Sequence, residues 1–87
     1  MERTREPVDV ICVCGADGEF RPLRMQIPRE GRGRIDILEV LRCEAFSNIG
    51  AESLRFLCRG RQEGRECMVE LQYALRSHIW HLTRMIY

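Results

Sequence analysis

The sequence predicts an all-β, mainly antiparallel protein, folded as a small barrel or a strongly curved sheet of about five to six strands. Apolar residues recur at every second position in several short segments. Turn-forming residues, such as the GADG run, separate these segments. Closure of the sheet is expected because an open sheet would leave long strand edges exposed.

The chain is expected to form a single small β domain over residues 1–87, with residues 1–7 as a polar lead-in. Its 45% hydrophobic and 31% charged residues are typical of an ordinary globular domain. A chain of this length buries roughly 60–65% of its unfolded surface, so its core is adequate but small. A second copy could supply further burial, and we therefore expect a homodimer or a higher homo-oligomer.

The net charge of +1 excludes a general electrostatic attraction to nucleic acid or membranes. All the basic residues are Arg, which reflects either a GC-rich genome or planar, bidentate recognition of phosphate or guanine. The charged start MERTREP is followed by no apolar segment of the signal-peptide type. No apolar run approaches the roughly 20 residues that cross a bilayer. We expect a soluble, cytoplasmic protein.

A first hairpin is predicted over residues 8–27. Its opening strand, VDVICVC, places four residues on one face: Val8, Val10, Cys12 and Cys14. The GADG turn follows, and EFRPLRMQI resumes the alternation at Leu23, Met25 and Ile27. Pro22 cannot donate a backbone hydrogen bond, so its strand is an edge or starts after a break.

The middle of the chain is harder to assign. The segment PREGRG is expected to be a loop, and RIDILEV over 34–40 alternates as a strand does. Further on, the spacing of Ile37, Leu38, Leu41 and Ala45 also suits a helix. We therefore expect an irregular or briefly helical segment around 41–52.

The last part of the chain allows two interpretations. As a helix, residues 65–87 would carry one apolar stripe: Met68, Leu71, Leu75, Ile79, Leu82 and Ile86. As strands, the same residues place Cys67, Val69, Leu71 and Tyr73 inward, and later Trp80, Leu82 and Ile86. No Ser, Thr, Asp or Asn is present to cap a helix at Arg65. The strand-like segment 53–59 and the polar GRQEG favour a hairpin at this point.

The chain resembles a loose family of short proteins from Firmicutes genomes and their mobile elements, for which no common function is known. The resemblance rests on VICVCGADGEFRPLRMQI and on FLCRGRQEGRECMVELQYALRSHIWHL, and does not cover the middle of the chain. It implies an all-β fold with a turn from Ala74 to Ser77 between two strands. RGRQEGR is then the tip of a hairpin.

Catalytic, metal and cofactor sites are not predicted. Five Cys without a secretory signal are expected to be reduced and mostly buried, including Cys12 and Cys14. His78 and His81 would face opposite ways on a strand, so they cannot easily share a metal ion. No nucleophile elbow or Gly-rich phosphate loop occurs, and Glu66 and Glu70 lie on a solvated strand face. We expect a protein that is not an enzyme.

Two groups of Arg are candidates for ligand binding. One surrounds the predicted hairpin tip: Arg55, Arg59, Arg61 and Arg65. The other lies around the PREGRG loop: Arg29, Arg32 and Arg34. If the two tips meet, they would form an Arg-lined mouth for phosphate, with Tyr73 and Trp80 available to stack on a base. The alternative is that both groups are solvated hairpin ends and that Trp80 belongs to the core.

The sequence thus predicts a non-enzymatic binding module for a phosphorylated ligand, either a nucleotide or a nucleic acid. The resemblance to mobile-element proteins would suit sequestration of a nucleotide signal. The alternative is a protein-interaction module that pairs through an exposed edge strand, such as 19–27 or 78–86. Ligand binding requires the Arg side chains to converge on one concavity, whereas strand pairing requires an exposed edge.

Overall fold

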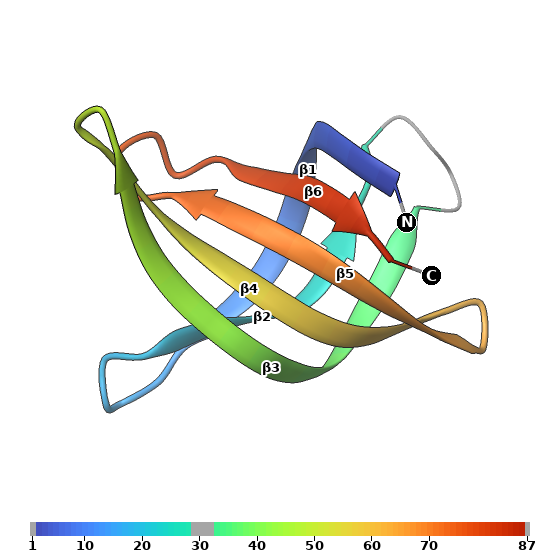
Figure 1. Ribbon diagram of the computed structural model, residues 1–87. Coiled ribbons are helices and arrows are strands. Elements are labelled where there is room, and N and C mark those ends of the chain that lie inside the picture. Colours follow the sequence, from blue (N-terminus) through green and yellow to red (C-terminus); the bar gives the residue numbers. More distant parts are fainter. Residues whose placement is uncertain (1, 29–32, 87) are drawn as a thin grey trace.

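The computed structural model describes residues 2–28 and 33–86, which form a closed antiparallel barrel (Figure 1). The predicted all-β fold is confirmed. The six strands are β1 (Glu2–Cys14), β2 (Phe20–Gln26), β3 (Arg34–Asn48), β4 (Ala51–Gln62), β5 (Arg65–Ala74) and β6 (Trp80–Met85). None of the described residues belongs to a helix capable of crossing a bilayer.

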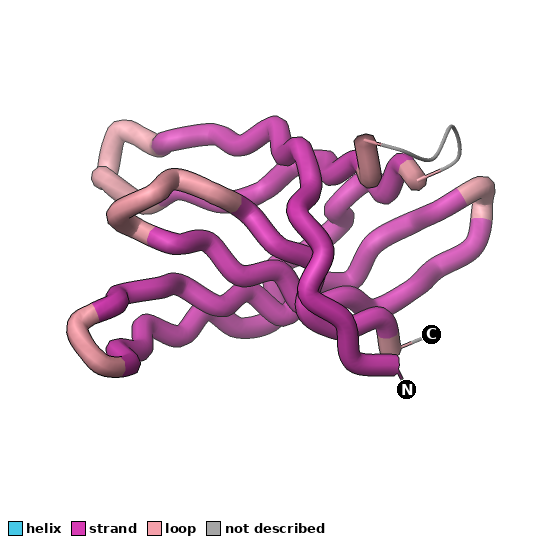
Figure 2. Tube along the Cα trace, turned by 90° about the horizontal axis from the view of Figure 1, so that it is seen from above, coloured by secondary structure: helices cyan, strands magenta, loops and turns pink. Residues whose placement is uncertain are grey.

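Each strand pairs with the next one in the chain, and β6 closes the barrel by pairing with β1. Seen from above, the connecting turns lie at the two ends of the barrel (Figure 2). The predicted polar lead-in over residues 1–7 is wrong, because β1 already begins at Glu2. This first part of β1 pairs with β6, from Glu2 opposite Met85 to Val8 opposite Trp80. Closure of the barrel therefore depends on it.

The β4–β5 connection decides between the helix and the strand interpretations of residues 65–87. Glu63 and Gly64 form the turn with positive φ angles of 51° and 79°, and the flanking strands pair from Gln62–Arg65 to Ser53–Ala74. The helical interpretation of residues 65–87 is therefore wrong. Positive φ at both turn positions matches the right-handed twist of the two strands. The next turn lies at residues 75–77, before β6.

The core lies between the inner faces of the strands. Its fully buried side chains include Met25, Ile35, Phe56, Val69 and Leu71. The inward prediction is confirmed for Cys67, Val69 and Leu71, and for Trp80 and Leu82. Near its end, β6 shifts register between its pairs with Glu70 and Leu71, so Met85 packs against the core where Ile86 was expected.

The irregular or helical segment expected around 41–52 does not exist. β3 continues through it and pairs with β4 as far as Asn48 opposite Ala51. Two register shifts explain the misleading pattern, since β3 has one extra residue at Leu38 and another at Leu41. Each extra residue interrupts the two-residue alternation of a strand, and the resulting apolar spacing imitates that of a helix.

The pairing between β2 and β3 is short. It covers only Arg24–Gln26 opposite Arg34–Asp36, and the β1–β2 and β3–β4 hairpins then point apart (Figure 1). Pro22 lies in the part of β2 that β3 does not pair, which confirms that it sits at an edge. Because no strand of the described residues pairs with this side of β2 at Pro22, the missing N–H removes no hydrogen bond from the sheet.

The prediction of mostly buried cysteines is wrong for three of the five. Cys58 and Cys67 are buried, but Cys12, Cys14 and Cys43 are exposed, and all five are free thiols. The divergence of β2 from β3 is the reason, because the inner faces of β1 and β3 have no covering strand at that end. The alternating pattern therefore placed Cys12 and Cys14 on the inner face without burying them, and it made no statement about Cys43.

Candidate functional site

Of the predicted arginines that the structure describes, Arg34, Arg59, Arg61 and Arg65 lie around the β4–β5 turn and the start of β3, whereas Arg55 lies apart from them. Arg61 pairs with Asp36 across β4 and β3, which places the β4–β5 turn near the start of β3 (Figure 1). Arg61 and Arg65 are exposed there. Arg29 and Arg32 lie outside the described residues.

Arg59 and Arg34 are engaged with carboxylates. The Arg59 Nη1 lies 2.8 Å from Glu66 Oε1, and its Nε lies 3.3 Å from Glu39 Oε1. Hydrogen bonds to Glu66 and then Glu39 raise the pKa of Arg59. Arg34 lies 3.4 Å from Asp36, whose pKa is lowered chiefly by its hydrogen bond from Arg24. These ion pairs are exposed and leave less positive charge for a ligand at this end.

Arg55 is separated from the hairpin tip and lies in the first half of β4, on its outer face. Its guanidinium lies 4.4 Å from the centroid of the Phe46 ring, and its Nε lies 3.8 Å from Glu70 Oε1. The Arg55 Nε is buried and has no hydrogen-bond partner among the described residues. The side chain is thus held in place while part of its donor capacity is unused.

Arg55 lines a groove of about 560 Å³ on the outer face of the barrel, together with two other arginines. Arg5 comes from β1 and Arg76 from the β5–β6 turn, and both are exposed without an ion pair among the described residues. We call it the three-arginine groove. With Glu52 as the carboxylate in its lining, the lining charge is +3 − 1 = +2.

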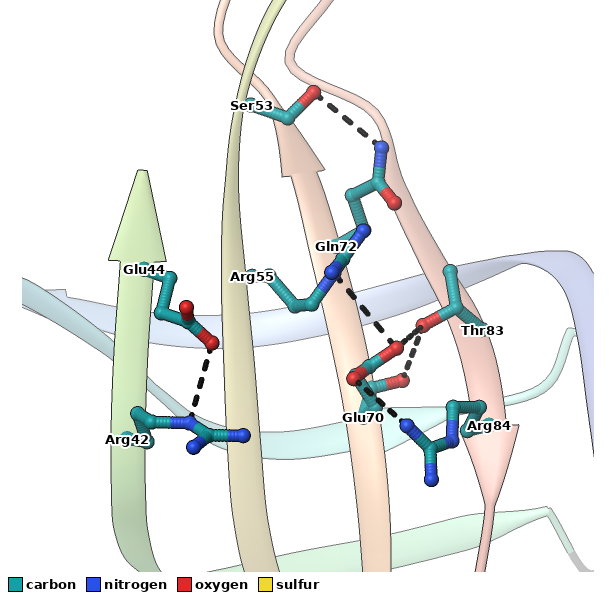
Figure 3. A network of polar contacts seen from close by, with 8 residues as sticks. All are labelled: Arg42, Glu44, Ser53, Arg55, Glu70, Gln72, Thr83 and Arg84. Carbon is teal, nitrogen blue, oxygen red and sulfur yellow. Dashed lines mark hydrogen bonds and ion pairs between the residues drawn. The ribbon is translucent and has the colours of Figure 1, made fainter. Parts of the chain in front are cut away.

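The floor of the three-arginine groove is built by strand side chains (Figure 3). Gln72 Nε2 donates to Ser53 Oγ at 3.4 Å, and both residues line the groove. Beside them, Glu70 accepts a hydrogen bond of 2.9 Å from Thr83 and lies 3.7 Å from Arg84. Because Glu70 is nearly buried and contacts charged groups on both sides, it anchors Arg55 from below.

His81 adjoins this floor, since it pairs with Gln72 across β5 and β6. Burial, and then the charge of Arg5, lower the pKa of His81. Its Nδ1 is buried without a hydrogen-bond partner in the described part of the chain. Both effects favour the neutral imidazole, and burial is the larger of the two.

Tyr73 and Trp80 lie elsewhere. Tyr73 follows Gln72 on β5 and points to the opposite face, where its ring lies 4.9 Å from that of Trp80. Trp80 is 7% exposed and also packs against Phe56, at 5.4 Å. The two residues line a second groove of about 630 Å³, in which Tyr73 Oη and His78 Nδ1 are 2.6 Å apart. The structure therefore separates these aromatic rings from the three-arginine groove.

Sequence reasoning missed most of this groove. Arg5 lay in the supposed lead-in and Arg76 in a turn, and no local pattern connects two residues so far apart in the chain. Within residues 2–28 and 33–86, no cluster of three or more His, Cys, Asp or Glu side chains is arranged to hold a metal ion. Comparisons with protein-family models, curated proteins and solved structures find no match to this chain.

Proposed function

We propose that this protein is a non-enzymatic binding module for a phosphorylated ligand, a nucleotide or a nucleic-acid strand, and that it binds the phosphate in the three-arginine groove. The observation that carries this proposal is the convergence of Arg5, Arg55 and Arg76 from three separate elements on one concavity. Guanidinium groups bind phosphate oxygens through charge-assisted, often bidentate hydrogen bonds.

Two features of the groove support this chemistry. Arg55 is already positioned by Phe46 and Glu70, so less conformational entropy is lost when it binds an anion. Ser53, Gln72 and Ser77 add neutral hydrogen-bonding groups around the arginines. The hairpin tip has less positive charge available for a ligand, because Arg59 and Arg34 already form ion pairs with carboxylates there.

The proposal is tested by calorimetric titration with pyrophosphate, a nucleoside triphosphate and a short single-stranded oligonucleotide. Arg5→Gln and Arg76→Gln should each weaken binding by about tenfold to a hundredfold, which corresponds to about 1–3 kcal/mol per contact. Arg→Lys at the same positions should restore little affinity, because an ammonium group lacks the planar fork. Binding should also weaken as salt is added.

Arg61→Gln and Arg65→Gln are matched controls, since they remove the same charge from an exposed position at the hairpin tip. They should leave affinity almost unchanged. Should the tip variants lose affinity while the groove variants keep it, the phosphate site lies at the tip. Should none of the phosphorylated probes bind the wild type, the proposed function is wrong.

A further inference from the structure

Most of one edge of β3 has no strand beside it. β2 pairs with β3 only at Arg34–Asp36, and no other strand of the described residues pairs with this edge. After the extra residue at Leu41, β3 pairs with β4 without a further shift, from Arg42 opposite Leu57 to Asn48 opposite Ala51. We call this regular segment, Arg42–Asn48, the free arm.

The backbone groups of the free arm alternate in direction. Ile49 and Gly50 form a two-residue turn, so Asn48 and Ala51 are a hydrogen-bonded pair. In an antiparallel ladder, the N–H and C=O groups of Cys43, Ala45 and Ser47 then point away from β4. All three residues are exposed. A strand edge with unpaired donors and acceptors is a template for one more strand.

We propose that the free arm pairs, antiparallel, with the free arm of a second copy of this chain, about a two-fold axis at Ala45. The register follows from the length of the arm. With the axis at its midpoint, all its residues find a partner, and Arg42 lies opposite the partner's Asn48. An isologous contact of this kind closes as a dimer and cannot extend into a fibre.

The charges on the free arm favour this register. Glu44 would lie opposite the partner's Phe46, over whose ring the Arg55 guanidinium is held at 4.4 Å. The exposed Glu44 carboxylate would thus approach the partner's Arg55, and the two-fold axis repeats this pair. On the other face, the small side chains of Cys43 and Ala45 permit close approach.

Three registers shifted toward the start of the arm are less favourable. An axis at Glu44 would place the two Glu44 carboxylates opposite each other, and an axis at Arg42 would do so for two guanidinium groups. An axis at Cys43 would bring the partner's Ile49 turn to Ile37, next to the point where β2 joins β3. The axis at Ala45 avoids like charges and leaves that junction open.

Ala45→Pro tests the pairing by sedimentation equilibrium. Proline removes an N–H that points away from β4, so the monomer loses no ladder hydrogen bond, but a neighbouring arm can no longer pair there. We expect the wild type to be a dimer of the 10.2 kDa chain and the variant to be a monomer with the same circular dichroism spectrum. Ala45→Ser keeps the N–H and should remain a dimer.

Cysteine cross-linking tests the register, in a background where Cys12, Cys14 and Cys43 are replaced by Ser. Ala45→Cys should form a covalent dimer on mild oxidation, since facing residues of a hydrogen-bonded pair lie about 5.5 Å apart, within disulfide range. Ser47→Cys should not, because its two copies would lie about 13 Å apart along the strands.

Three results would overturn the proposal. The wild type could remain monomeric at high micromolar concentration, which would leave the free arm to a strand of a different protein. A dimer could survive Ala45→Pro and so use another surface. Efficient cross-linking at Ser47 without cross-linking at Ala45 would exclude the register. The partner's Glu44 would lie beside Arg55, which also lines the three-arginine groove. Pyrophosphate binding is therefore measured on the Ala45→Pro monomer, where the two proposals succeed or fail separately.

Discussion

Cys58 shows how strongly this small core acts on a single ionisable group. Its side chain is fully buried between β3 and β5, and desolvation raises the pKa of its thiol from 9.0 to about 12. In the unfolded chain the same thiol would ionise near its ordinary pKa. The folded state is therefore not weakened by Cys58 below pH 9, and loses stability as the pH rises from 9 toward 12.

We expect the free energy of unfolding of the wild type to fall by about 2 kcal/mol between pH 8 and pH 10.5 from Cys58 alone. Urea denaturation at several pH values would measure this slope. Cys58→Ala should be less stable at pH 8, but its free energy of unfolding should fall less steeply with pH. Part of the decrease that remains comes from Cys67, whose pKa is also raised by burial. Equal slopes in the two proteins would contradict this account.

At the scale of single elements, the β3–β4 turn contains a residue that does not suit its backbone. Ile49 has a φ angle of 48° and Gly50 one of 77°, a pair of values that Asn-Gly adopts readily. A β-branched side chain in the left-handed region is strained, and Ile49 is 100% exposed, so no burial offsets that strain.

Ile49→Asn should therefore stabilise the protein by about 1 kcal/mol, because Asn tolerates positive φ and Ile does not. Thermal denaturation followed by circular dichroism would measure the gain. Ile49→Val keeps the β-branch and should give no comparable increase. A loss of stability in the Asn variant would show that Ile49 makes a contact that this turn geometry does not account for.

At the scale of the whole molecule, Trp80 stands where the barrel closes. It pairs with Val8 of β1 and with Tyr73 of β5, and its ring packs against Phe56 of β4. One side chain thus joins the first and last strands to the middle of the sheet. The sequence allowed Trp80 to be either a stacking surface for a base or a core residue. Its burial assigns it to the core.

Trp80→Ala should lower the free energy of unfolding by about 3–5 kcal/mol, because a large cavity would open at the closure. In a domain of this size, that loss leaves little or no folded protein at room temperature. Urea denaturation and the dispersion of the amide NMR spectrum would measure it, and Trp80→Phe should keep part of the stability. A folded Ala variant with weaker nucleotide binding would instead restore Trp80 as a stacking surface.

The sequence by itself determined the class of the fold and most of its turns. Alternation in residues 53–59 and 65–73, the GADG and RQEGR turns, and the missing helix cap at Arg65 all depend on residues that are close together in the chain. Strand alternation and turn chemistry are local properties, so local patterns were sufficient to predict them. The edge position of Pro22 followed for the same reason, from the missing N–H of one residue.

Tertiary structure alone decided the features that depend on strand register and on closure. The extra residues at Leu38 and Leu41 exist only relative to β4, and the exposure of Cys12 follows from the short β2–β3 pairing. Among the predicted ligand-binding residues that the structure describes, Arg55 alone lines the three-arginine groove. Arg5 and Arg76 join it because β1 and β6 meet when the barrel closes, and a contact between the two ends of a chain leaves no trace in its local patterns.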